Sequence, residues 1–516
     1  MLILNKKLNI EVNLVAKKLY GIIYMTPRQT KLSIVDLNDF SVIEEVTSNF
    51  YSNHTYEYQH NIQAITKSLN GFLLILKEYG VKNYRFWGNQ QPLDEISARY
   101  LGEQIYVRTT LRVHWLNTSQ LTYYKAVAIV THLDNFKKIS SSLTFLLSLG
   151  SERVSLSQFN NQKFASTWNV DLGSAQLYDV NRTLKPTTNS SMTVLDDYID
   201  SKLEHLKHVF ANQKISSNLI LQDSLIINKK FIPVDQPSYA MPLEEFKKLY
   251  QKVTNASDQF LMDFFKVDEN EITSITSYFL LLNKIIRLIK AQNIILTDIT
   301  VSDGLAIDRA QRTGLKKQNF DELILTTAEN MATRYLTSKS HRENVTMIAL
   351  HLFDQLKKLH HLGKRERLLL QVSCILADIG NYINQQGHYN HSAYILQSTK
   401  VLGLSNTENL IIAEIARYHS SESPSSSATH FKQLDPEVQM KVAKLSSFLR
   451  IADSLDDSRE EKIQKISISL RETELIIFAY SNQNIALEQW SFTNKAELFE
   501  KVFGLKAILK QRRQLQ

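Results

Sequence analysis

The sequence predicts two α/β domains followed by an all-helical domain and a small α/β tail. Three observations support this fold class. The order β-β-β-α-β occurs twice before residue 312, strand-like segments disappear between about Phe320 and Ile466, and alternation of apolar and polar residues returns after Lys465. With 516 residues, the chain is long enough for several domains that each bury a core.

The first α/β half opens with strands. Their expected ranges are 21–25 (GIIYM), 31–37 (KLSIVDL) and 41–51 (SVIEEVTSNFY). Apolar residues from Ile62 to Tyr79 recur at helical spacing, and Gly80 is a typical residue to end that helix. A fourth strand is expected at 84–87.

The second half repeats this order. Three strands are expected at 143–149, 153–156 and 163–170. An amphipathic helix through Leu195 and Phe210 leads to a strand at 219–221. The segment from Leu243 to about Asp308 is mostly helical, with one strand-like patch at 294–301 that would return to the second sheet.

Long helical periodicities mark the next part of the chain. Helices are expected through 345–359, 368–379 and 438–449, and Asp435 with Pro436 fits the start of the last one. Alternation at 465–470 and 474–480 predicts a small sheet, after which we expect a basic helix to end the tail. The expected domains are therefore 1–135, 136–312, 313–465 and 466–516.

The composition excludes several classes of site. Glycine is scarce, with 14 residues in 516, about 2.7% against a typical ~7%, and no G-x-G occurs. Glycine-rich phosphate loops are therefore missing, which excludes P-loop, Rossmann and kinase sites. The single cysteine, Cys374, excludes an intramolecular disulfide and a CxxC zinc site, and we expect it to be a small core residue in a reducing cytoplasm.

Charge and hydropathy favour a soluble protein with anionic partners. The net charge of +8 comes from 60 Lys and Arg against 52 Asp and Glu, and no dense basic run points to a specific nucleic acid. The first 18 residues lack the features of a secretory signal. Polar and charged residues interrupt the most apolar stretch, 278–296, among them Asn283, Lys284, Arg287, Lys290 and Gln292, so no membrane span is expected.

Histidines and carboxylates gather in the helical part, where eight of the 14 histidines lie between His341 and His430. His341 stands four residues before Val345, and Asp453 stands four residues after Leu449, so both share an apolar helix face. Asp378 follows a strongly apolar helix. Ionisable groups that point into a core require a partner or a metal, so we expect these three to converge.

This trio resembles the metal ligands of the HD-domain superfamily of helical phosphohydrolases, in which His, a His-Asp pair and a distant Asp bind a metal that activates water. The site is incomplete, because Ala377 stands where the pair has its histidine. Three other histidines are candidate substitute ligands: His388, His391 and His419. The alternative is a set of buried polar residues that pair with one another, and it predicts no tightly bound transition metal.

Four longer segments resemble the C-terminal part of the exopolyphosphatase and guanosine pentaphosphate phosphatase family, Ppx/GppA. They are HRENVTMIALHLFDQL, LLLQVSCILADIGNYINQQGHYNHSAYIL, IIAEIARYHS and LSSFLRIADSLDDS, and they span about 120 residues. The resemblance implies that the first 310 residues form that family's two actin-like (ASKHA, ribonuclease-H-like) domains. It implies an HD-like helical domain after them.

The family's catalytic motifs are replaced in this chain. The first phosphate loop falls on 24–29 and keeps neither its Asp nor its Gly, although it includes Arg28. The catalytic Glu falls at about Gln120, which cannot act as a general base. The second loop falls on 148–153, where Gly150 is the only glycine left and Glu152 would repel an anion.

Arg28 and Arg153 are candidate phosphate contacts, with Gly150 beside them, and surface arginines without a ligand are the alternative. A segment related to the family's Thr-Ser-Ala-x-Arg falls near 88–92 and lacks the basic side chain.

Three functions remain open from sequence. They are a phosphohydrolase acting on polyphosphate or guanosine pentaphosphate, a non-catalytic binding or regulatory paralogue, and a metal-dependent HD hydrolase. Magnesium is a candidate cofactor, and the sequence establishes none. The candidate partners are polyphosphate or a guanosine polyphosphate, a second copy in a homodimer, and an active paralogue.

Overall fold

A computed structural model describes most of the chain. The described residues are 17–50, 58–150, 153–173, 176, 177, 179, 180, 183, 191–213, 217–222, 227, 230–233, 235–267, 269–425 and 427–513. The chain divides into two compact units. One contains Met1–Leu116, Val127–Ile129 and Thr300–Gln318, and the other contains Asn117–Ala126, Val130–Ile299 and Asn319–Gln516.

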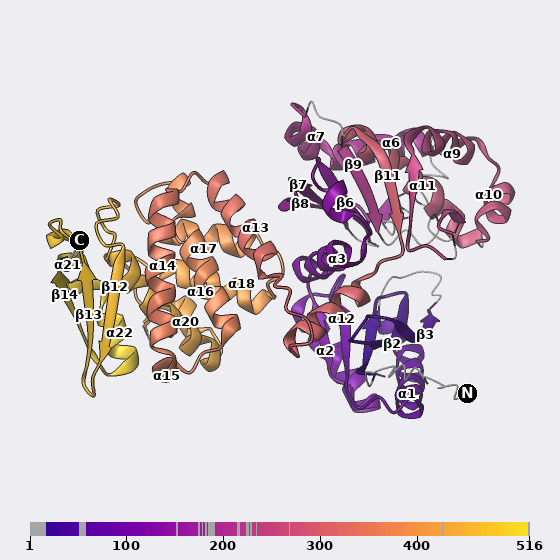
Figure 1. The fold of residues 1–516 in the computed structure, drawn as a ribbon. Helices are drawn as coiled ribbons and strands as arrows, with labels where there is room; N and C mark the ends of the chain where they lie inside the picture. The colour runs from indigo at the N-terminus through magenta and orange to yellow at the C-terminus, as the bar shows by residue number, and fades with distance from the viewer. Residues whose placement is uncertain are drawn as a thin grey trace, which may run out of the picture. The chain divides into compact units, whose positions relative to one another are not determined.

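The first unit contains a five-stranded sheet with the order β3-β2-β1-β4-β5 (Figure 1). Its strands are β1 (Leu19–Met25), β2 (Gln29–Asp36), β3 (Val42–Asn49), β4 (Tyr84–Asn89) and β5 (Val113–Leu116). The first three pair in antiparallel fashion, and β4 and β5 continue the sheet in parallel from β1. Its helices are η1 (Tyr58–Asn61), α1 (Ile62–Glu78), α2 (Glu95–Thr109) and α12 (Val301–Arg312).

The central strand explains how this sheet forms. All of β1 from Tyr20 to Met25 is buried, as expected for a strand covered on both faces. Leu69 of α1 and Ile105 of α2 pack with β1 in one core, so both helices cover the same face. Gly80 follows α1 with a positive φ of 66°, a conformation that glycine adopts without strain, as predicted.

The second unit contains a six-stranded sheet with the order β10-β11-β9-β6-β7-β8. Its strands are β6 (Thr144–Leu149), β7 (Val154–Asn160), β8 (Lys163–Val170), β9 (Ser217–Gln222), β10 (Ser238–Pro242) and β11 (Ala291–Thr297). Here too the first three strands are antiparallel and β9 and β11 follow in parallel, while β10 adds an antiparallel edge. The repeated order confirms the duplicated, ribonuclease-H-like arrangement expected of actin-like domains.

In the described residues, seven helices lie before or between the strands of this second sheet along the chain. They are α3 (Thr118–His132), α4 (Phe136–Ile139), α6 (Ser191–Lys202), α7 (Glu204–Phe210), α9 (Leu243–Asn255), α10 (Asp258–Phe265) and α11 (Glu269–Leu288). The single helix expected through Leu195 and Phe210 is wrong, because it breaks at Leu203 between α6 and α7. Both pieces still bury their apolar face in the same core, so periodicity identified the face and missed the break.

The same unit continues into a helical region, orange in Figure 1, that carries the histidine cluster. Its helices are α13 (Asp321–Arg334), α14 (Lys339–Gln355), α15 (Lys357–His360), α16 (Lys364–Leu376), η2 (Ile379–Tyr382), α17 (His388–Ser398), α18 (Asn406–Arg417), α19 (Thr429–Lys432) and α20 (Pro436–Ser454). Asp435 precedes α20 as expected, but its side chain accepts no capping hydrogen bond.

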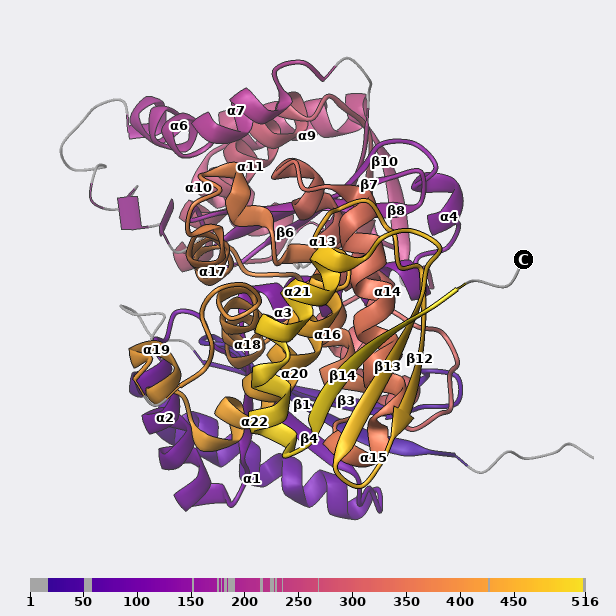
Figure 2. The same ribbon diagram turned by 90° about the vertical axis from the view of Figure 1, so that its left-hand side faces the viewer.

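A three-stranded sheet ends the described chain, and Figure 2 shows its strands side by side. Its elements are β12 (Lys465–Leu470), β13 (Glu474–Tyr480), α21 (Ala486–Lys495), α22 (Glu497–Phe503) and β14 (Lys506–Arg512). The basic helix expected at the end of the tail is wrong, because this segment is β14. It pairs in parallel with β13 from Lys506 to Arg512, so sheet pairing overrides the local helical preference of its lysines.

In the part of the chain that the structure describes, no helix has the length and apolar character needed to cross a bilayer. The boundaries 135/136, 312/313 and 465/466 stay predictions.

Candidate functional site

The first expected phosphate loop is a tight turn between β1 and β2. The amide of Thr26 donates to the carbonyl of Gln29 at 2.8 Å, and the amide of Arg28 donates to Oγ1 of Thr26 at 3.4 Å. The side chain of Arg28 is exposed. The turn thus closes on itself through its own backbone, without the glycine that the family loop has.

The second expected loop lies between β6 and β7. The amide of Gly150 donates to the carbonyl of Arg153 at 2.9 Å, and a Cβ at position 150 would stand 3.0 Å from that oxygen. Nε of Arg153 donates to Asp171 at 2.6 Å, so its charge is already paired. Ser151 and Glu152 lie outside the described residues.

Gln120, which the sequence resemblance places at about the position of the family's catalytic Glu, lies in the first turn of α3. Its side-chain Oε1 accepts from the backbone amide of Asn117 at 3.2 Å. The backbone amide of Gln120 donates to the side-chain Oδ1 of Asn117 at 2.9 Å. This reciprocal pair is a capping box. The side-chain amide of Asn117, through Nδ2, also donates to the carbonyl of Leu404 at 3.1 Å. This hydrogen bond connects the start of α3 to the helical region.

The three residues expected to converge in the helical region do lie together. Nε2 of His341 is 3.3 Å from Oδ1 of Asp453 and 3.7 Å from Oδ2 of Asp378. Its other nitrogen, Nδ1, is 2.7 Å from Oδ2 of Asp456, which is fully buried. Lys495 pairs with the other carboxylate oxygen of Asp453, Oδ2. His341 is therefore the centre of an ion-pair network.

The pKa values in this network follow from its geometry. Burial lowers the pKa of His341, but the contacts with Asp453 and Asp456 outweigh burial and raise it to about 9. For Asp453, burial raises the pKa, and the charge of Lys495 together with His341 lowers it well below the usual range. These shifts describe a protonated imidazole of His341 beside an ionised carboxylate of Asp453.

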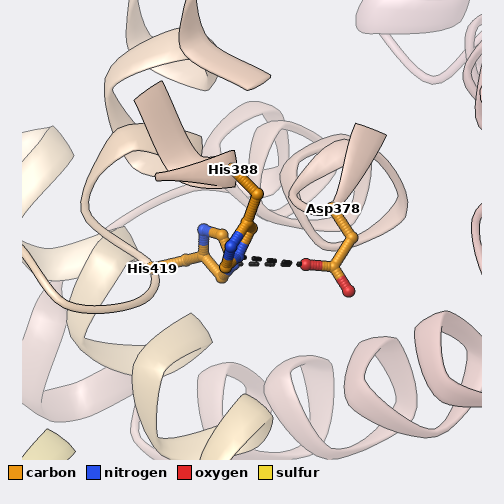
Figure 3. A group of neighbouring side chains, drawn as sticks. All are labelled: Asp378, His388 and His419. Carbon is orange, nitrogen blue, oxygen red and sulfur yellow. Dashed lines mark hydrogen bonds and ion pairs between the residues drawn. The ribbon is translucent and has the colours of Figure 1, made fainter. Parts of the chain in front are cut away.

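A second group surrounds Asp378, which joins α16 to η2 (Figure 3). Its Oδ1 is 3.4 Å from Nε2 of His419 and 3.5 Å from Nε2 of His388, and those two nitrogens are 3.2 Å apart. Its Oδ2 pairs with Arg459 at 2.7 Å. The candidate metal-ligating cluster in the described chain is this one, Asp378, His388 and His419.

Backbone carbonyls orient both rings. Nδ1 of His388 is 3.1 Å from the carbonyl of Gln385, and Nδ1 of His419 is 2.6 Å from the carbonyl of Ala416. His419 is almost fully buried, with 2% of its surface exposed. His391, the other substitute ligand considered from sequence, lies on α17 and is not part of this cluster.

A pocket of about 370 Å³ borders this group. Its lining residues are Leu336, Thr337, Ser338, Asp378, Asn381, Gln385 and Arg459. Cys374 lies in the neighbouring core, where burial raises its pKa, in agreement with the expected core role. The pocket therefore offers a polar approach from solvent to Asp378.

Sequence reasoning missed three members of these networks: Asp456, Arg459 and Lys495. Asp456 follows Asp453 by three residues, so helical spacing could have indicated it. Lys495 comes from α21, 42 residues after Asp453, and no local pattern links the two.

Comparisons with known proteins found one family model and several solved structures that are similar to parts of this chain. Residues 325–497 match the family model "Ppx/GppA phosphatase, domain III". A solved Ppx/GppA family member from Aquifex aeolicus is 12% identical, with 57% of this chain and 98% of that chain covered and a TM-score of 0.46. An exopolyphosphatase from Cytophaga hutchinsonii is 14% identical, with coverages of 58% and 100% and a TM-score of 0.47. Residues 325–497 of this chain are therefore similar to domain III of the Ppx/GppA phosphatases.

Proposed function

We propose that this chain binds a phosphoanhydride ligand, polyphosphate or a guanosine polyphosphate, and hydrolyses it at least roughly a hundredfold more slowly than a family member with intact motifs. The ligand class comes from the names of the family and its relatives, phosphatase and exopolyphosphatase. The excess of 60 basic over 52 acidic residues favours such an anion.

The main support for slow hydrolysis is the hydrogen-bonded pair of Asn117 and Gln120 at the start of α3. An amide has no basic oxygen that takes a proton at neutral pH, and loss of a positioned base typically costs about 10²–10⁴-fold in rate. The Oε1 atom of Gln120 is also engaged, because it accepts from the amide of Asn117. Both facts support binding without efficient water activation.

The loops support the same conclusion. Arg153 is paired with Asp171, so it contacts a phosphate only if that pair opens. The backbone amide of Gly150, the single remaining glycine, donates to the carbonyl of Arg153 rather than to a ligand.

The test is phosphate release from long-chain polyphosphate by the purified full chain with magnesium. We expect a rate near background for the natural sequence and for Gln120→Ala, with polyphosphate binding retained in both. Gln120→Glu is the matched variant, since it restores the carboxylate without changing side-chain length, and we expect it to raise the rate. Ordinary turnover that Gln120→Ala abolishes would contradict the proposal.

A further inference from the structure

Three side-chain atoms converge at a point between the start of α17, the end of α16 and the end of α18. They are Nε2 of His388, Nε2 of His419 and Oδ1 of Asp378, and Figure 3 shows them directed at one another. We propose that this trio binds a divalent transition-metal ion, with zinc as the best fit. The proposal is independent of the phosphate ligand discussed above.

The hydrogen bonds of the two rings leave lone pairs at the centre of the trio. A carbonyl oxygen only accepts, so each Nδ1 that faces one must carry the ring proton. In a neutral imidazole, Nε2 then presents a lone pair to its neighbours. Oδ1 of Asp378 is buried, and within the described residues no donor forms a hydrogen bond to it.

When both rings are neutral, the three acceptors face one another with no donor between them, so they repel one another and lack solvation. A bound cation removes both costs, because each lone pair then coordinates it. Imidazole nitrogens with a carboxylate oxygen are a donor set that zinc and its neighbours in the first transition row prefer.

The separations fit a metal of that size. Bonds from zinc to nitrogen or oxygen are about 2.0–2.2 Å, so two ligands of a tetrahedral ion lie about 3.3–3.5 Å apart. The three distances in the structure are 3.2, 3.4 and 3.5 Å. The trio thus has the dimensions of one face of a tetrahedron.

Surrounding groups hold these ligands in place. The carbonyls of Gln385 and Ala416 fix the two rings, and Arg459 holds Oδ2 of Asp378 at 2.7 Å, which leaves Oδ1 for the ion. Such outer contacts orient metal ligands in proteins. The fourth coordination position of such an ion would be filled by water or an anion.

This ligand set differs from the one that the sequence suggested. Both nitrogens of His341 lie against carboxylates, Asp453 and Asp456, and a nitrogen that donates to a carboxylate has no lone pair for a metal. Asp378 is the ligand that the two sets share. The missing histidine at Ala377 therefore does not leave the site short, because His388 and His419 supply the imidazoles.

The experiment uses the full chain, stripped with a chelator and titrated with zinc or with cobalt. We expect one equivalent of zinc per chain by elemental analysis after dialysis, and a visible absorption band typical of tetrahedral cobalt. His388→Ala and His419→Ala are each expected to weaken zinc binding at least about a hundredfold. Substitution of residues that only orient a metal ligand costs up to about a hundredfold in affinity, and loss of a ligand itself should cost at least as much.

His391→Ala is the matched control, because His391 lies on the same helix one turn after His388 and outside the trio. Its zinc affinity should equal that of the natural sequence. Failure of the natural chain to retain zinc or cobalt would overturn the proposal and indicate that the two rings share a proton instead. Equal loss in the His391→Ala variant would also overturn it. Stoichiometry and spectrum are measured on the natural chain, so a variant that fails to fold does not decide the result.

Discussion

Two arginines of α16 form ion pairs that differ in solvent exposure. The effect of burial on the strength of an ion pair can therefore be measured on one helix. Arg365 pairs with Glu408 of α18 through Nε–Oε1 at 2.6 Å and Nη2–Oε2 at 2.9 Å. Arg367 pairs with Asp354 of α14 in the same two-pronged way, at 2.8 and 2.7 Å. The acids differ in exposure, with 19% of the Glu408 side chain exposed and 48% of the Asp354 side chain.

The structure gives the expected size of each interaction. The pair at Asp354 is an exposed pair, for which couplings of about 0.2–1 kcal/mol are typical. At Glu408 solvent screening is weaker, and Arg365 also donates to the carbonyl of Gly403 at 3.0 Å. Hydrogen bonds to charged groups contribute about 1.5–3 kcal/mol, so we expect a coupling of about 2 kcal/mol there.

Double-mutant cycles on the full chain test this difference. Each acid and each arginine is changed to alanine, singly and together, and the free energy of opening α16 and α18 is measured by hydrogen–deuterium exchange. At 1 M salt the screening length is about 3 Å, so the Asp354 coupling should vanish while most of the Glu408 coupling remains. Coupling energies that agree within about 0.5 kcal/mol would refute the role of burial.

Three further predictions concern single positions. Gly380→Ala should destabilise the helical region by about 3 kcal/mol or more in urea unfolding, because its Cβ would stand 2.0 Å from the carbonyl oxygen of His388. Gly387→Ala should cost only about 1 kcal/mol, because Gly387 has a φ of 70° but faces open space. Equal costs for the two variants would contradict this prediction. Burial raises the pKa of Glu408, but its arginine partner outweighs burial and lowers it, so the stabilisation from this pair should be present above about pH 4.5 and be lost as the pH falls further. A pH-independent difference between the natural chain and the Glu408→Gln variant would count against it. Cys374 should resist thiol reagents in the folded chain and react on unfolding, because burial raises the pKa of its thiol. Fast labelling of the folded protein would disprove the core position of Cys374.

The sequence alone determined which segments become strands and helices in most of the chain. The short apolar segments of β1 and β2, and the helical spacing of α1, reflect which side chains must leave water, and that pattern is local. It also predicted that His341 and Asp453 point inward. Local patterns were weaker at element ends, as the break at Leu203 shows.

Tertiary structure decided which inward groups meet. Helical periodicity identifies a face but does not identify the neighbouring helix that packs on it, so the contact of His388 with His419, 31 residues away, was left open. The same reason explains Lys495 beside Asp453. For β14, a free edge of β13 decided the structure, since pairing with a strand elsewhere in the chain outweighs local preference. The fold class was therefore determined by burial patterns along the chain, and the site by contacts between segments distant in sequence.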